Sequence, residues 1–369
     1  MSSENRPDPP ALNESDVGGF IQVLPIYLRE GTQVEGLSFS LLPWGAPGLS
    51  AAYGKSQAES EPMLVLAYEW LVPWLRPTSR LSKSDIEALH LHRYATDHRL
   101  AIGALPFTAP IAGDRPDFTV TVESAAQRGL DCCALTVQAR RGAHALFVTL
   151  RRRIVQIDPA AFAHLGGFML YVWFPGQHGM ELPFRSNDEA PIRELLEALA
   201  SYRPSAGPTT VSSGELPDQL PDLDMVTTPS GAAFYAVPFR NAVPDTVFAS
   251  IMGFDLGFAF TTEHTPSSAW AELERLVVQH DNPGIDWLLL SVGAPNRDGL
   301  IFPTEEALAQ FMLEHPSPLA SPTHISRITL HLWSTGEAHE LLSDVAPSFG
   351  PLYMGTIPPH RVIHPATEV

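Results

Sequence analysis

Proline is the residue type that most constrains what this chain can fold into, because 35 prolines occur among its 369 residues. A proline ring fixes φ and removes a backbone N–H donor, so helices and central strands rarely continue through it. Most of these prolines stand between segments that have helical or strand periodicity. The sequence therefore predicts many ordered loops between elements of moderate length, rather than long continuous helices.

The composition predicts a folded α+β protein of two domains. Hydrophobic residues make up 44% of the chain and charged residues 17%, far from disordered compositions. A chain of this length exceeds the size at which one core usually keeps growing. Each domain is expected to pack helices on a mostly antiparallel or mixed sheet. The predicted divisions are a disordered leader over 1–18, an N-terminal α+β domain over 19–203, a Pro/Ser/Asp-rich linker over 204–224 and a C-terminal α/β-like domain over 225–369.

The N-terminal half contains one clear helix signal and a series of strand signals. Ser84 stands three residues before Glu87, which is the spacing of a capping box at a helix start. The runs near 100–107, 117–123, 130–139 and 144–157 are rich in Val, Thr, Phe and Leu and are separated by turn residues. We predict that these four runs form an antiparallel meander.

The C-terminal half alternates strands and helices. Strands are expected over 232–239, 285–293 and 325–333, and helices over 266–280, 303–315 and 336–345. Thr265 followed by Pro266 marks the start of the first of these helices, as N-cap and first helical residue. This alternation favours βαβ units.

The two halves share one short pattern. Pro175 and Gly179 follow an apolar strand with three residues between them, and Pro295 and Gly299 do the same. In both places an apolar residue and a helix come next. A duplicated strand–turn–strand–helix unit would explain this.

The formal net charge of −18 limits the partners of the chain. Such a charge repels nucleic acid and anionic lipid and attracts a cationic protein. No secretory signal and no segment long enough to span a bilayer is found. The only cysteines, Cys132 and Cys133, are adjacent on a predicted strand and point to opposite faces, so a reduced, cytoplasmic setting is expected.

The densest group of metal-type ligands is His90, His92 and His98 with Asp97. Residues two apart on a helix point in nearly opposite directions, so His90 and His92 cannot both bind one ion there. Only a distorted segment would bring them together. A metal-dependent hydrolase with its site here is therefore an alternative, and a solvated helix face with one core histidine is the simpler interpretation.

The only local positive feature is a set of arginines, and on a strand Arg151 and Arg153 would point together. The set comprises Arg140, Arg141, Arg151 and Arg153. Such a patch could bind an anion or an acidic surface of a partner, although internal ion pairs are the commoner use of arginine in an acidic chain.

No catalytic spacing, cofactor motif or resemblance to a known family is found. The sequence therefore predicts a non-enzymatic acidic interaction module that binds a basic protein, in the manner of an immunity protein, antitoxin or adaptor, and that needs no cofactor. The alternatives are the metal-dependent hydrolase and a structural subunit of a larger assembly.

Overall fold

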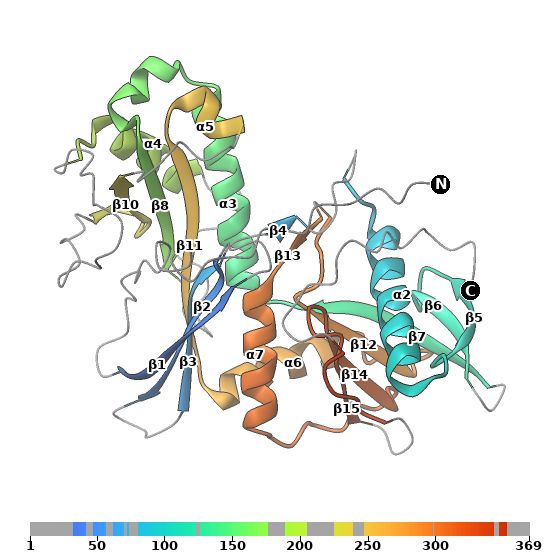
Figure 1. Cartoon of the computed structure of the whole chain (residues 1–369). Coiled ribbons are helices and arrows are strands. Elements are labelled where there is room, and N and C mark those ends of the chain that lie inside the picture. The colour runs from blue at the N-terminus through green and yellow to red at the C-terminus, as the bar shows by residue number, and fades with distance from the viewer. Residues whose placement is uncertain are drawn as a thin grey trace, which may run out of the picture.

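The computed structural model describes most of the chain and arranges it around two large sheets and a small one (Figure 1). The described residues are 32–41, 47–56, 62–69, 72–73, 80–122, 126–175, 189–204, 225–238, 247–297, 299–342 and 347–352. The protein belongs to the α+β class, as predicted.

The first sheet has seven strands in the order β1-β2-β3-β11-β8-β10-β9. Its strands are β1 (Thr32–Leu41), β2 (Pro47–Ser56), β3 (Pro62–Glu69), β8 (Phe168–Pro175), β9 (Val226–Thr227), β10 (Ala233–Pro238) and β11 (Asp255–His264). Only β8 and β11 run parallel, and the other neighbours are antiparallel. The parallel pair is buried at the centre of the sheet.

The second sheet has six strands in the order β15-β14-β12-β7-β6-β5. Its strands are β5 (Thr108–Ala112), β6 (Phe118–Thr121), β7 (Gln127–Leu135), β12 (Trp287–Val292), β14 (Arg327–Leu332) and β15 (Ala338–Leu342). β7, β12 and β14 are parallel, and antiparallel strands complete both sides. A short pair, β4 (Val72–Pro73) with β13 (Leu300–Ile301), lies between the two large sheets (Figure 1).

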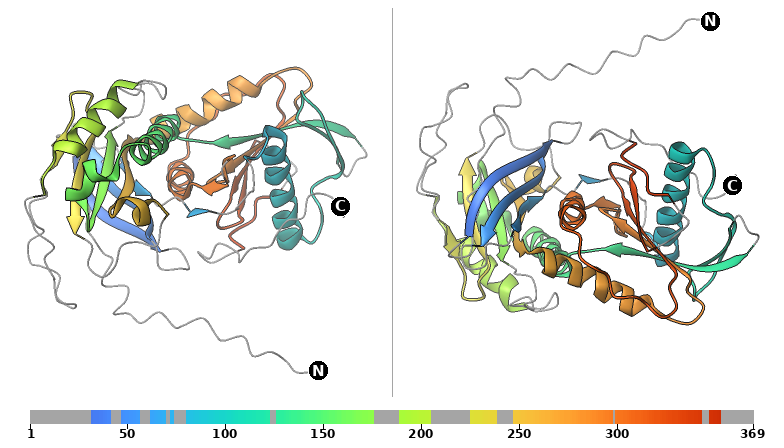
Figure 2. Two further views of the ribbon diagram at one scale, coloured as in Figure 1. Left: turned by 90° about the horizontal axis from the view of Figure 1, so that it is seen from above. Right: turned by 90° about the horizontal axis from the view of Figure 1, so that it is seen from below.

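Helices cover both faces of the six-stranded sheet (Figures 1 and 2). α2 (Lys83–Ile102) packs on one face, where Leu91 and Tyr94 meet Trp287 and Leu289. α6 (Pro266–His280) and α7 (Pro303–Glu314) pack on the other face. The seven-stranded sheet is accompanied by α3 (Gln138–Val155), α4 (Glu189–Ser201), α5 (Val247–Met252) and the 3-10 helix η1 (Pro159–Leu165).

One hydrophobic core joins the two large sheets. Leu170 and Phe174 of the first sheet belong to the same buried cluster as Leu290 and Leu330 of the second. The cluster gains its size because strands with apolar residues on both faces, such as β12, are buried on both sides.

Three predicted elements differ from the structure. The run 100–107 is not a strand, because its first residues end α2 at Ile102 and Gly103 caps that helix. The run 144–157 is not a strand but part of α3, whose buried residues include Ala143, Phe147, Leu150 and Ile154. Their spacing of three and four residues is the helical period, so the β-branched content of the run was misleading. The run 336–345 is not a helix, because it forms β15 against β14.

The predicted leader over 1–18 and almost all of the linker over 204–224 lie outside the described residues, so the domain division stays a prediction. Both large sheets combine strands from either side of that linker. For the duplicated unit, residues 176–188 of its first copy also lie outside the described residues. No helix in the described part of the chain is long and apolar enough to cross a membrane.

Candidate functional site

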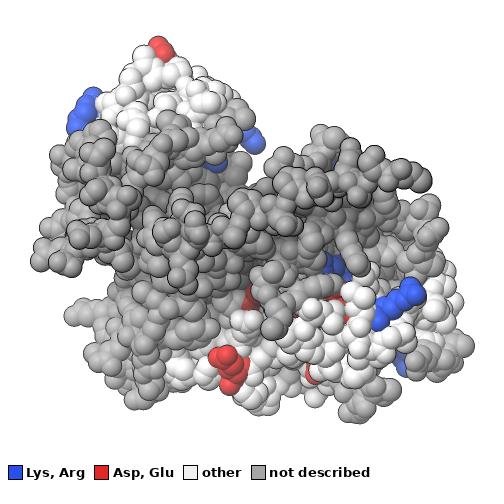
Figure 3. Space-filling view, viewed as in Figure 1, with Lys and Arg blue, Asp and Glu red and all other residues white. Residues whose placement is uncertain are grey.

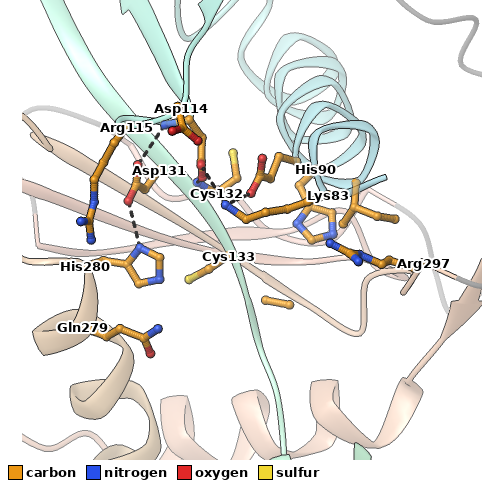
Figure 4. Close-up of a pocket in the computed structure, with 14 residues that line it drawn as sticks. Lys83, His90, Asp114, Arg115, Asp131, Cys132, Cys133, Gln279, His280 and Arg297 are labelled. Carbon is orange, nitrogen blue, oxygen red and sulfur yellow. Dashed lines mark hydrogen bonds and ion pairs between the residues drawn. The ribbon is translucent and has the colours of Figure 1, made fainter. Parts of the chain in front are cut away.

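A cleft of about 610 Å³ lies beside β7, between the start of α2 and the end of α6 (Figure 4). Four carboxylates, three cationic side chains and two histidines contribute to its lining. The lining residues are Lys83, Ile86, Glu87, His90, Asp114, Arg115, Asp117, Asp131, Cys132, Cys133, Ala134, Gln279, His280 and Arg297. The cleft thus collects residues from five separate segments of the chain.

The cleft exists because β6 is shorter than β7. β6 pairs with β7 only as far as Leu130, whereas β12 pairs with the opposite edge of β7 from Leu130 to Leu135. Residues 131–135 therefore have one neighbouring strand among the described residues. The free edge of this stretch forms part of the cleft wall.

Beside Cys132, the Asp117 side chain makes the hydrogen bond that a neighbouring strand would make. Its carboxylate accepts the Cys132 N–H at 3.0 Å, and its own N–H donates to Asp131 Oδ1 at 3.1 Å. These bonds fix the loop between β5 and β6, which includes the cis Arg115–Pro116 peptide. Backbone groups of alternate residues point to the same edge of a strand, so the N–H and C=O of Ala134 also point toward the cleft.

A cationic side chain connects two of the carboxylates. Lys83 Nζ lies 2.8 Å from Glu87 Oε1 and 3.5 Å from Asp117 Oδ1. The hydrogen bond with Glu87 raises the pKa of Lys83. Burial raises the pKa of Glu87 and outweighs the opposing effect of Lys83. This corner of the cleft therefore holds its charges in internal ion pairs.

On the α6 side, His280 Nδ1 lies 2.9 Å from Asp131 Oδ2 (Figure 4). Burial acts to raise the pKa of Asp131, but the hydrogen bonds from His280 and the Asp117 amide lower it below its ordinary value. Asp131 is therefore ionised at neutral pH and fixes the orientation of the imidazole.

His90 is a buried polar side chain in the wall of the cleft. It is 2% exposed, and neither ring nitrogen makes a hydrogen bond of normal geometry among the described residues. Burial, with the charges of Arg141 and His331, lowers its pKa to about 3, although the Pro295 backbone acts in the opposite direction. The ring is neutral at physiological pH and offers one donor and one acceptor.

Cys132 and Cys133 lie on opposite faces of β7, as predicted. Cys132 belongs to the core under α2, and Cys133 packs against the core shared by the two sheets. Both thiols are free, and burial raises the pKa of each. Since the thiolate is the nucleophilic form, neither cysteine is activated for covalent chemistry.

The predicted metal ligands do not converge. His98 Nδ1 bonds to the Ala104 carbonyl at 2.8 Å, and Asp97 bonds to Arg93 and His331 at 2.6 and 3.0 Å. His92 is half-buried, which lowers its pKa. In the part of the chain that the structure describes, no group of three His, Cys, Asp or Glu side chains could hold a metal ion.

The strand geometry behind the predicted arginine patch is wrong, because all four arginines lie on α3. Residues two apart on a helix point apart, so Arg151 and Arg153 diverge. Arg151 lies 3.6 Å from Asp255, and Arg153 lies 3.0 Å from Glu189.

The other two arginines of this set are used inside the protein. Arg141 makes two hydrogen bonds to Glu305, at 3.1 and 2.9 Å, and lies over the Phe302 ring. Arg140 is 2% exposed, and burial lowers its pKa to about 9. The paired arginines therefore support the internal role rather than an exposed patch.

Sequence reasoning singled out His90, Cys132 and Cys133 as candidate side chains, Glu87 as a helix-cap residue and 114–117 as an acidic loop, but it did not predict that they meet in one cleft. Lys83, Asp117, Asp131 and His280 carry no local motif, and β7 and the end of α6 are far apart in the chain. On the face shown in Figure 3, the described charged side chains occur in small separate groups rather than as one patch of a single sign.

No protein-family model, no curated protein and no solved structure matches this chain. In its described residues the chain is an α+β protein with two mixed sheets and a charged cleft beside a stretch of β7 that pairs with β12 alone.

Proposed function

We propose that this chain is a non-enzymatic interaction module that binds a basic protein in the cytoplasm, as an immunity protein, antitoxin or adaptor does. The cleft is the observation that carries the proposal. It offers hydrogen-bonding and charged groups for recognition, but its thiols are protonated and its ion pairs are internal. Groups that donate, accept or carry charge are what a binding site needs. Nucleophilic catalysis also needs an activated nucleophile, and the protonated thiols do not supply one.

The charge of the chain supports a basic protein as partner, rather than nucleic acid or a membrane. A net charge of −18 steers cations toward the molecule over a distance set by the salt concentration. The lining of the cleft also has an excess of negative charge, because it contains four carboxylates and three cationic side chains. Electrostatic steering of this kind accelerates association more than it strengthens the final complex.

Affinity capture of the tagged chain from its native cell lysate tests the proposal. We expect one stoichiometric basic protein to be retained at about 0.05 M salt and largely lost at about 0.5 M, where the screening length is much shorter. The captured protein should then bind the purified chain with an association rate that falls as salt increases. Retention of no basic protein, or binding that does not change with salt, would count against the proposal.

A further inference from the structure

We infer that the open edge of β7 is the docking site for an extended segment of the basic partner, which adds to the six-stranded sheet as a strand. This inference rests on the proposed function and names the site and the mode of binding. The edge comprises residues 131–135, which pair with β12 on one side only among the described residues. Because Asp117 already accepts the Cys132 N–H, residues 133–135 are left to pair, and at about 3.3 Å per residue they match a segment of about three residues.

The backbone of this edge is ready to pair. Cys132 N–H is already bonded to Asp117 in place of a strand, and the next backbone groups on the same edge, those of Ala134, face the cleft. Ala134 is only half-buried. Strand addition at such an edge takes its affinity from main-chain hydrogen bonds and its specificity from pockets for alternate side chains.

His90 is a second and independent indication that the cleft takes a ligand. A buried polar side chain normally has hydrogen-bond partners, because leaving one without them destabilises the fold. His90 is 2% exposed, lines the cleft and makes no hydrogen bond of normal geometry within the described chain, although the Pro295 backbone acts on its pKa. A peptide in the cleft brings both N–H and C=O groups, which suit the donor and the acceptor of a neutral imidazole.

The flanking charges define the side chains of the segment. Glu87 and Asp117 lie beside Lys83 at the start of α2, and Asp131 lies beside His280 at the end of α6. Successive side chains of an added strand point to opposite sides in turn. A segment with lysine or arginine on both sides meets carboxylates that already pair with Lys83 or His280. Its attraction therefore comes from the excess of negative charge in the cleft lining and over the whole chain.

A labelled basic peptide, Lys-Thr-Lys-Lys-Thr-Lys-Thr, tests the inference by fluorescence anisotropy with the full chain. We expect binding at low salt, and at least about a tenfold loss of affinity in Ala134→Pro, which removes the N–H that the added strand needs. Ala320→Pro is the matched control, because Ala320 is exposed in a loop outside the cleft. No binding to the wild-type chain, or equal binding to Ala134→Pro, would overturn the inference.

Hydrogen exchange gives a readout that does not depend on the variant folding. Adding the peptide should slow exchange of the Ala134 amide in the wild-type chain, and unchanged exchange there would overturn the inference.

Light scattering tests whether a second copy of the chain occupies the edge instead. A dimer that Ala134→Pro dissociates would assign the edge to that second copy and overturn the inference. If the captured basic protein binds wild type and Ala134→Pro equally, the docking mode fails while the proposed function stands. If no basic protein is captured, the proposed function fails.

Discussion

The two adjacent cysteines show at the residue scale how burial makes a thiol unreactive. Burial raises the pKa of both thiols, so the thiolate fraction at neutral pH is very small. We expect both to react with a thiol reagent at pH 7.5 at least about 100-fold more slowly than a free cysteine, since each unit of pKa above the ordinary value reduces the thiolate tenfold. The measurement is the rate of labelling of the native protein, with the denatured chain as control. A rapidly labelled Cys133 would instead favour a cysteine enzyme that uses His280 and Asp131.

Glu306 is a buried carboxyl whose ionisation opposes folding. It accepts hydrogen bonds from the Ser334 amide and hydroxyl, yet burial raises its pKa to about 7. The folded state therefore holds this proton more tightly than the unfolded state, in which the pKa is 4.5. Its contribution to stability is complete below about pH 4.5 and is lost as the pH rises to about 7, at a cost of about 3 kcal/mol. Denaturation across this range should show the loss in wild type and a flatter profile in Glu306→Gln. The same slope in both proteins would contradict this assignment.

At the element scale, α2 contains an ion pair that is buried in the core. Arg93 and Asp97 form a buried pair four residues apart, and the carboxylate also contacts His331. Asp97→Ala should cost about 3–5 kcal/mol, because it leaves the guanidinium buried without that carboxylate. Glu197→Ala is the matched control, since Arg193 and Glu197 form an exposed pair with the same spacing on α4, worth about 0.5 kcal/mol or less. Urea denaturation measures both, and equal losses would show that burial is not the deciding factor.

The start of α2 also shows where sequence reasoning stops. The chain offers two capping boxes two residues apart, and the structure uses Ser82 with Asp85 instead of Ser84 with Glu87. Ser82→Ala should therefore cost about 1 kcal/mol of folding free energy, and Ser84→Ala much less. The reverse order, measured by thermal denaturation, would support the cap predicted from the sequence. Glu87 is instead engaged by Lys83 in the cleft, a contact that local spacing does not predict.

Regular periodicity was predictable, and pairing between distant segments was not. The strands at 285–293 and 325–333 and the helix that begins after Thr265 are confirmed, because each has a clear period or cap. The run in α3 was misread, since β-branched content outweighed a helical spacing of buried residues. The cleft depends on where β6 ends along β7 and on which helix ends meet there. The end of β6 and the meeting of the helix ends are decided by packing of the whole chain. The sequence therefore did not predict the cleft, although some of its residues attracted attention as histidines, cysteines or acidic residues.

At the scale of the whole molecule, the path of the chain between the two sheets decides how it folds. β11 stands between β3 and β8, and β12 stands between β7 and β14. The strands after the predicted linker thus fill central positions beside strands that precede it. Residues 225–369 alone would expose the edges of β11 and β12, and unpaired central strands are prone to aggregate.

We therefore expect residues 225–369, expressed alone, to lack a cooperative unfolding transition. The intact chain, cut at a protease site inserted within 205–224, should behave differently, because the shared core would hold its two pieces together. Size-exclusion chromatography of the cut protein should give one species, and calorimetry should give one transition. If the fragment instead folds as a stable monomer, the predicted boundary at 204–224 separates two independent domains. The six-stranded sheet, which pairs β7 with β12, would then form only after each domain had folded.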